Sequence, residues 1–265
     1  MSRVAEFLKD PVKVFELDWA DVTKRIVTFI KAHVPGNAVL GMSGGVDSSL
    51  VATLAVKALG KEKLHCILMP TKSNTMLDKQ YALNVINQLG LSHETINIQT
   101  ILESFEAQDP YARDFALNNL KPRIRMSLLY TYANTKNARV LGTSNRSEWM
   151  VGYFTKYGDG GADLEPITGL YKQQVFRLAR FLSVPQEIVD RPPSAGLWAG
   201  QTTEGELGIS YLKLDQILYG TELGCSEDDL MKTCGVTEQE IELVQKKVAN
   251  SAHKRILPPC FTLGS

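Results

Sequence analysis

The sequence lacks long hydrophobic runs and any excess of charge. No stretch of about 18 consecutive apolar residues occurs in the chain, so we expect no membrane partner. The first ten residues have no apolar core of signal-peptide length, which makes the cytoplasm the expected location. The 29 basic residues balance 29 acidic ones, so there is no general attraction to DNA or RNA, and we expect no nucleic-acid partner.

Cysteine is also scarce, and internal repeats and low-complexity segments are missing. The four cysteines are Cys66, Cys225, Cys234 and Cys260. None belongs to a C-x-x-C pair, and four in a chain of 265 residues make no disulfide framework. We therefore expect free thiols in a reducing compartment. The histidines are scattered without metal-ligand spacing, so we expect no zinc site.

Short apolar runs alternate with segments of helical periodicity in the first half of the chain. The expected strands cover residues 38–42, 64–69, 93–98 and 138–142. The expected helices cover residues 18–32, 48–59, 78–89 and 124–135. This alternation predicts an α/β fold, with a Rossmann-like, doubly wound parallel sheet flanked by helices. Ligands of such sheets bind at the carboxyl ends of the strands.

The C-terminal part reads as helical, over residues 206–219, 227–232 and 238–249. A loop-rich segment, 191–204, precedes it and contains Pro192 and Pro193. We expect one domain over 1–265, with a soft boundary near residue 190. Long irregular connections are usually functional or mobile, so the loops 71–80 and 191–204 are expected to close over a bound ligand.

A glycine-containing turn follows the first expected strand. It reads Ser43-Gly44-Gly45-Val46-Asp47-Ser48. The glycines let the backbone approach a phosphate closely, and the first amides of the next helix point at the ligand. Asp47 would repel a polyphosphate unless a cation such as Mg²⁺ lay between them. The turn is neither a Walker loop nor a dinucleotide fingerprint. From the residues alone, an ordinary capped strand–helix turn is the alternative.

The six residues of this turn resemble the pyrophosphate-loop signature of the ATP pyrophosphatases. The resemblance implies that the loop grips the β and γ phosphates while AMP is transferred to an oxygen of the substrate. Two later segments, 142–148 (GTSNRSE) and 152–166 (GYFTKYGDGGADLEP), resemble the NAD synthetase family within that superfamily. Shorter matches follow at 121–126, 169–172, 193–198 and 253–255, so the resemblance spans about Phe15 to Pro259.

The resemblance also implies roles for individual residues. ATP would contact Gly41, Met42, Ser43, Gly44, Gly45, Val46, Asp47, Ser48, Thr143, Lys172 and Ser194. Mg²⁺ would bind Asp47 and Glu148. Deamido-NAD, the acid dinucleotide, would contact Arg123, Lys156, Asp163, His253 and Lys254. The catalytic group would comprise Asp47, Glu148, Asp159 and Lys172, with Asp159 near the metal and the incoming ammonia. Ser194 stands where many members have Thr, and Glu204 is a further candidate for the nicotinoyl end.

The implied reaction amidates nicotinic acid adenine dinucleotide to NAD through an acyl-adenylate, and it releases AMP and pyrophosphate. Cations would neutralise the anions that meet at the site, and a carboxylate would take a proton from ammonium. Only about 37 residues precede the first motif, too few for a glutaminase domain, so free ammonia is the expected donor. A separate glutaminase subunit stays open. The family also implies a homodimer with the dinucleotide site near the interface.

Two other functions are compatible with parts of the pattern. A tRNA thiolase shares the loop, but neutral charge and unpaired cysteines disfavour it. A regulatory nucleotide-binding module would need no turnover, whereas the carboxylates around the site favour metal-assisted chemistry. Taken singly, Glu148 could be a solvated helix residue and Lys156 a surface charge. These residues belong to motifs that occur along the chain in the order of the family that they resemble, which favours the catalytic interpretation.

Overall fold

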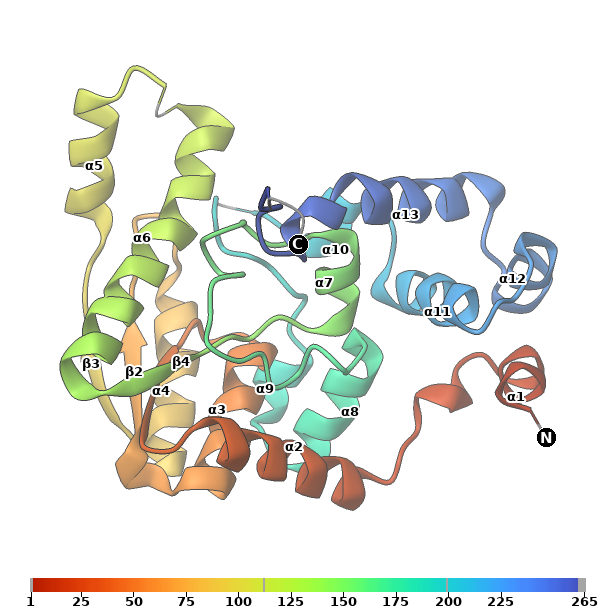
Figure 1. The fold of residues 1–265 in the computed structure, drawn as a ribbon, viewed down its shortest axis with the longest axis horizontal. Coiled ribbons are helices and arrows are strands. Elements are labelled where there is room, and N and C mark those ends of the chain that lie inside the picture. The colour runs from red at the N-terminus through yellow and green to blue at the C-terminus, as the bar shows by residue number, and fades with distance from the viewer. Residues whose placement is uncertain (1, 112, 199, 262–265) are drawn as a thin grey trace.

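The computed structural model describes residues 2–111, 113–198 and 200–261 as a layered α/β structure (Figure 1). Helices cover both faces of a central sheet, and a helical lobe formed largely by C-terminal residues lies beside it. Across these described ranges, we find no helix with both the length and the apolar character needed to cross a membrane.

The sheet contains four parallel strands in the order β3-β2-β1-β4. They are β1 (Asn37–Gly41), β2 (Leu64–Leu68), β3 (Ser92–Thr95) and β4 (Ala138–Leu141). The chain moves from β1 to β2 on one side, while β4 pairs with the other side of β1. The carboxyl ends of β1 and β4 therefore flank a topological switch point, where ligands bind in open α/β sheets.

Alternate residues of the strands face two separate cores, because side chains of a strand point to opposite faces. Leu40 and Cys66 belong to the core shared with α2, α3, α4, α8 and α9. Val39 and Ile67 belong to the core shared with α5 and α6. The helices that cover the first face are α2 (Trp19–His33), α3 (Val46–Leu59), α4 (Met76–Leu89), α8 (Lys172–Phe181) and α9 (Gln186–Val189). The helices that cover the second face are α5 (Gln99–Gln108) and α6 (Asp114–Lys136). The expected doubly wound fold class is confirmed.

Two predicted elements of the first half of the chain differ from the structure by more than two residues at one end. The third strand is an exposed edge strand that ends at Thr95, although Ile96 N and Ile98 N still donate to Leu68 O and Pro70 O beyond it. Helix α6 starts ten residues before the predicted helix at 124 and contains Pro122 in its interior. Proline removes an amide donor and usually ends a helix, so its presence hid the first turns of α6.

The helical lobe has a core of its own. Phe7 and Phe15 pack in it with Leu214, Ile217 and Ile241. The lobe comprises α1 (Arg3–Lys9), α7 (Arg146–Val151), α10 (Thr203–Leu207), α11 (Tyr211–Glu222), α12 (Glu227–Cys234) and α13 (Glu238–Asn250). Short 3-10 helices cover Lys13–Phe15, Lys61–Lys63 and Ala252–Lys254. The soft boundary near residue 190 stays a prediction.

The helix predicted over 206–219 is two helices. Gly208 takes a positive φ of 74° and ends α10, and the Ser210 side chain then caps α11 by accepting a hydrogen bond from Lys213 N. The break turns the first residue of α11, Tyr211, into a fully buried position. This turn has a direct consequence for the functional site.

Candidate functional site

The predicted phosphate loop connects β1 to α3 at the switch point. Gly41 ends β1, and the buried Met42 donates its amide to Ile67 O. Gly44 has a φ of 82°, and a Cβ there would lie 2.2 Å from the Asp78 carbonyl oxygen of α4. Only glycine fits this position, because both its backbone conformation and its contact with α4 exclude a side chain.

Hydroxyl groups tie the loop to the first turn of α3. The Ser43 Oγ lies 3.0 Å from Ser48 Oγ and accepts from Gly45 N at 3.2 Å. Ser48 and Ser49 both donate to Gly45 O. No side chain caps α3, which begins at Val46, so its first amides remain available to an anion.

The second turn follows β4 and leads into α7. Asn145 caps α7 by accepting from Glu148 N at 3.0 Å, and its Nδ2 donates to Asp47 Oδ1 at 3.0 Å. One side chain thus joins the two turns at the carboxyl edge of the sheet. Thr143 lies in the same turn and is partly buried. The sequence motif contained Asn145, but its cross-link to Asp47 depends on the pairing of β1 with β4.

Three of the predicted catalytic residues converge on one point, which we call the acid–lysine centre: Asp47, Glu148 and Lys172. The Lys172 Nζ lies 2.6 Å from Asp47 Oδ2 and 3.1 Å from Glu148 Oε1. The lysine side chain is 1% exposed, against 20% and 17% for the two carboxylates. Helices α3, α7 and α8, far apart in sequence, therefore bring these charges together.

The charges of this centre do not balance. Burial lowers the pKa of Lys172, but the attraction of Asp47 and Glu148 outweighs it and raises the pKa above its usual value. Burial raises the pKa of Glu148 despite the pull of Lys172. Two carboxylates share a single ammonium group, so a further cation would stabilise their charged forms.

The acid–lysine centre also fits a divalent cation in its chemistry. Two converging carboxylates are what Mg²⁺ uses when substrate phosphates complete its coordination. The described residues contain no cluster of three or more His, Cys, Asp or Glu side chains suited to a metal. Phosphate and water oxygens would have to supply the remaining ligands.

Tyr211 is a contact of the centre that sequence reasoning missed. Its hydroxyl donates to Glu148 Oε1 at 2.6 Å, and its ring centroid lies 5.1 Å from Lys172 Nζ. Burial raises the pKa of Tyr211, so the hydroxyl keeps its proton and acts as a donor. No local signal distinguishes this tyrosine from an ordinary core residue, because its role depends on how α11 packs on α7.

Glu165 was also missed as a side chain facing this edge. Its carboxylate accepts from Ser144 N at 3.0 Å and lies where a Cβ on Gly142 would be, at 2.2 Å. Burial raises the pKa of Glu165 to about 8, and nearby Asp159 contributes. The glycine of the motif thus makes room for a carboxyl group beside Thr143.

Four of the predicted dinucleotide residues gather into a second group, the cationic face: Arg123, Lys156, His253 and Lys254. Arg123 Nε donates to Lys156 O at 3.4 Å, and Lys156 Nζ donates to His253 O at 2.8 Å. Lys254 Nζ donates to the carbonyls of Gly152 and Phe154, both at 2.8 Å. Segments around residues 123, 156 and 253 therefore meet although 130 residues separate their ends.

The two predicted aspartates of the 152–166 segment accept hydrogen bonds from backbone amides. Asp159 Oδ1 accepts from Thr155 N at 2.8 Å, and desolvation raises its pKa although the residue surface is exposed. Asp163 Oδ2 accepts from Val140 N at 2.7 Å, beside the bridge between Leu141 and Leu164. Asp163 anchors the segment on β4 through Oδ2, and the residue stays exposed.

Two predicted contacts lie away from the acid–lysine centre. Ser194 is exposed, and its Oγ accepts from Gly196 N; within the described residues, no hydrogen bond joins it to the phosphate loop. Glu204 Oε1 accepts from Tyr211 N and so caps α11. The segments 71–75 and 191–204 contact each other through Ser73 Oγ and Gly196 O, and Arg191 pairs with Asp78 at 2.6 Å.

Comparisons with known proteins agree on one family. The family model for NAD synthase matches residues 19–258. An ammonia-dependent NAD⁺ synthetase of Pyrococcus furiosus is 46% identical over 244 residues, which cover 91% of this chain and 94% of the relative. The structure of an ammonia-dependent NAD synthetase from Campylobacter jejuni, in complex with nitrate, has a TM-score of 0.79 and 34% identity, and the match covers 93% of this chain and all of that one.

A solved structure with a different named product is equally similar. The NMN synthetase of Francisella tularensis has a TM-score of 0.84 and 35% identity, with 94% of this chain and all of that chain covered. The region matched by the family model, residues 19–258, contains the phosphate loop, the acid–lysine centre and the cationic face. The chain belongs to the NAD synthase family, as its motifs predict.

Proposed function

We propose that this chain amidates nicotinic acid adenine dinucleotide with ammonia, at the expense of ATP, and so makes NAD. It is a ligase, as its relatives named ammonia-dependent NAD⁺ synthetases are. The observation that carries the proposal is the acid–lysine centre beside the uncapped start of α3. At one edge of the sheet, the start of α3 provides a site for an anion, and the acid–lysine centre provides the cation that neutralises the anion's charge.

In the first step the substrate carboxylate attacks the α-phosphorus of ATP, and pyrophosphate leaves. The amides at the start of α3 and the hydroxyls of Ser43 and Ser48 would hold the departing phosphates. Lys172 would balance developing negative charge, because it stays protonated between Asp47 and Glu148. Asp47 and Glu148 would hold Mg²⁺, which supplies charge neutralisation to the phosphate oxygens when bound.

In the second step ammonia attacks the acyl carbon, an amide bond forms and AMP leaves. Ammonium must lose a proton first, and Asp159 is the proposed acceptor. Its residue surface is exposed, and desolvation raises its pKa, which makes the carboxylate a better proton acceptor than an ordinary aspartate. Free ammonia as nitrogen source is supported by relatives named for it, which the chain matches over 94–98% of their length.

The cationic face is proposed to bind the acid dinucleotide. Its three charged residues, Arg123, Lys156 and Lys254, lie beside His253, and dinucleotide pyrophosphate is dianionic. Thr143 and Ser194 are proposed for ATP and Asp163 for the dinucleotide, on the family resemblance alone. Closure of the segment 191–204 would bring Ser194 inward.

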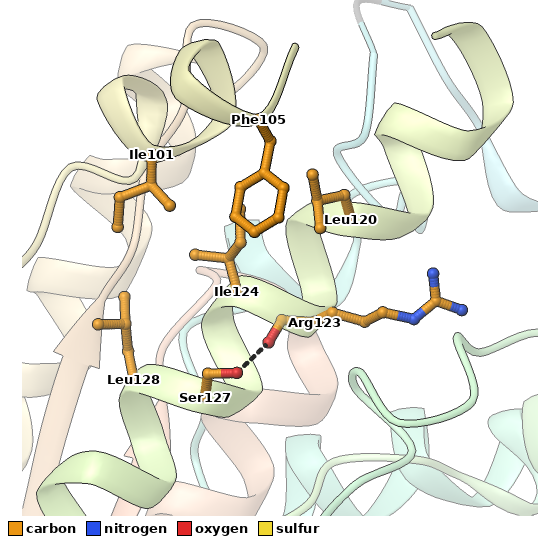
Figure 2. Close-up of a pocket in the computed structure, with 7 residues that line it drawn as sticks. All are labelled: Ile101, Phe105, Leu120, Arg123, Ile124, Ser127 and Leu128. Atoms are coloured by element: carbon orange, nitrogen blue, oxygen red, sulfur yellow. Dashed lines mark hydrogen bonds between the residues drawn. The ribbon is translucent and has the colours of Figure 1, made fainter. Parts of the chain in front are cut away.

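We also propose a homodimer. A hollow of about 370 Å³ between α5 and α6 is lined by Ile101, Phe105, Leu120, Arg123, Ile124, Ser127 and Leu128. Figure 2 shows the apolar side chains grouped between the two helices, while the Arg123 guanidinium points away from them. Phe105 is 45% exposed, so a second copy seated here would cover apolar surface next to the cationic face.

The dimer is tested with Phe105→Glu, which places a charge on the exposed apolar group. We expect the wild-type mass in light scattering to be that of two chains and the variant's mass to fall toward one. Phe29→Glu is the control, since Phe29 is 38% exposed on α2, across the sheet from α5. A monomeric wild type at micromolar concentration, or equal masses for both variants, would reject this interface.

The activity is tested by incubating the purified chain with ATP, Mg²⁺, ammonium and the acid dinucleotide. Equal molar yields of NAD, AMP and pyrophosphate are expected, with pyrophosphate absent when the dinucleotide is omitted. Glutamine in place of ammonium should give little NAD. ATP cleavage to ADP, or equal rates from glutamine alone, would contradict the proposal.

A second candidate substrate is nicotinic acid mononucleotide, which the similarity to NMN synthetase favours. Both acids carry the same reacting carboxyl group, so kcat/KM for each, measured in one preparation, decides between them. We expect the dinucleotide to be preferred, because relatives of 44–46% identity are named NAD⁺ synthetases. Free thiols at all four cysteines agree with the proposed reducing, cytoplasmic location.

A further inference from the structure

Helix α11 contacts the acid–lysine centre through two buried residues one turn apart, Tyr211 and Asp215. Residues four positions apart lie on one face of a helix. Tyr211 is 1% exposed and Asp215 is fully buried. Neither residue belongs to the motifs of the phosphate loop or of the 142–166 region, yet each is bonded to an element that carries a catalytic side chain.

The Tyr211 contact selects one oxygen of Glu148. The Tyr211 hydroxyl and Lys172 Nζ both donate to Oε1, at 2.6 and 3.1 Å. Within the described ranges, no hydrogen bond is made to Oε2. The geometry fixes the carboxylate by one oxygen and leaves the other available to a cation.

The Asp215 contact joins the helices that carry Glu148 and Lys172. Its Oδ1 accepts a short hydrogen bond from the Ser147 hydroxyl of α7, and its Oδ2 accepts from Gln173 N at 2.8 Å. The same Ser147 Oγ accepts from Lys172 N at 2.8 Å. One carboxylate therefore links the residue before Glu148 to the two residues that begin α8.

We propose that Tyr211 and Asp215 are positioning residues of the amidation site, which set where Glu148 and Lys172 stand relative to each other and to Asp47. This inference depends on the proposed function. Burying a carboxylate and a tyrosine hydroxyl costs free energy unless both are fully bonded, and apolar residues could tie three helices together at less cost. The hydrogen bonds of Tyr211 and Asp215 instead fix the positions of Glu148 and Lys172, which the proposed chemistry requires.

The decisive variant is Tyr211→Phe, which removes the hydroxyl and keeps the ring beside Lys172. We expect kcat to fall by about 10- to 100-fold and the half-saturating Mg²⁺ concentration to rise by about tenfold, because partners that orient a metal ligand have effects of this size. The KM for the acid dinucleotide should change little. The matched control is Tyr219→Phe, since Tyr219 lies on α11 but packs on Phe7, Phe15 and Tyr171.

The Mg²⁺ dependence distinguishes a positioning defect from a loss of folded protein. A loss of folded protein lowers the apparent kcat but leaves the half-saturating Mg²⁺ concentration unchanged, whereas a positioning defect raises that concentration. Asp215→Asn is the second variant, with the exposed Asp228→Asn as its control; it should raise the half-saturating concentrations of Mg²⁺ and ATP. If Tyr211→Phe does not fold, this second variant decides. Unchanged metal and ATP dependence in the folded variants would overturn the inference, whereas a wild type that makes no NAD would overturn the proposed function.

Discussion

The acid–lysine centre and the cationic face are built in opposite ways, although the same family motifs supply both. In the centre, a lysine with 1% exposure is bonded to two carboxylates, and Asn145 and Tyr211 hold these carboxylates in turn. In the cationic face, Arg123 and His253 are exposed and the contacts are mostly to backbone carbonyls. The centre is held by bonds between side chains, whereas the side-chain donors of the face bond to backbone carbonyls and would have to share or exchange these bonds to bind a ligand.

The largest effect is expected where the centre loses its only cation. Lys172→Met leaves Asp47 and Glu148 close together without a partner, and breaking a buried ion pair from one side costs about 3–5 kcal/mol of folding free energy. The variant should also lose nearly all NAD synthesis. Denaturant unfolding and kcat measure the two effects.

The matched control is Lys213→Met, because Lys213 pairs with Glu240 at 2.8 Å while 36% of its side chain is exposed. Its loss should cost no more than about 1 kcal/mol, and activity should persist. If both variants lost the same stability, the centre would be no more organised than a surface ion pair and the comparison would fail.

An intermediate effect is expected in the cationic face. Arg123→Ala should raise the KM for the acid dinucleotide by about tenfold at little change in kcat, which corresponds to about 1.4 kcal/mol of binding free energy. Steady-state kinetics with varied dinucleotide and saturating ATP gives both constants. Arg25→Ala, an exposed arginine on α2, is the control and should leave both constants at their wild-type values. A fall in kcat with unchanged KM would place Arg123 in the chemical step.

The last effect depends on pH and vanishes in acid; it concerns Glu165, whose carboxylate bonds to Ser144 N. Its pKa is 4.5 when unshifted and about 8 in the folded chain, so between these values the folded state binds more protons than the unfolded state. The free energy of unfolding therefore falls as pH rises through this window. Glu165→Gln keeps an acceptor for Ser144 N and removes the titration.

This variant should be more stable than wild type at pH 8 by up to about 4 kcal/mol, because the pKa is shifted by about 3.5 units and each unit is worth about 1.4 kcal/mol; the difference should vanish near pH 4. Thermal or denaturant unfolding across pH 4–9 tests the prediction. The control Glu242→Gln, an exposed residue of α13, should run parallel to wild type. A wild-type advantage that grows with pH would show that Glu165 is stabilised in its charged form.

The sequence predicted what local patterns encode. The strand–helix alternation predicted four parallel strands and a ligand site at their carboxyl ends. The order of the motifs predicted that Asp47, Glu148 and Lys172 act together. It could not predict Tyr211, because that contact depends on the Gly208 break and on the packing of α11 against α7. Pro122 concealed the start of α6, since its energetic cost within a helix is offset by tertiary packing that a sequence window does not contain.

The lack of space at Gly44 has a mechanical consequence. The phosphate loop rests directly on the Asp78 carbonyl of α4, and the Asp78 side chain pairs with Arg191 at the start of the 191–204 segment. The phosphate loop therefore contacts α4, and α4 in turn contacts the 191–204 segment. A bound triphosphate that displaced residue 44 would push on Asp78, and the ion pair of Asp78 would pass this movement to Arg191. Under the proposed function, nucleotide binding would then bias the position of the 191–204 segment through a single aspartate.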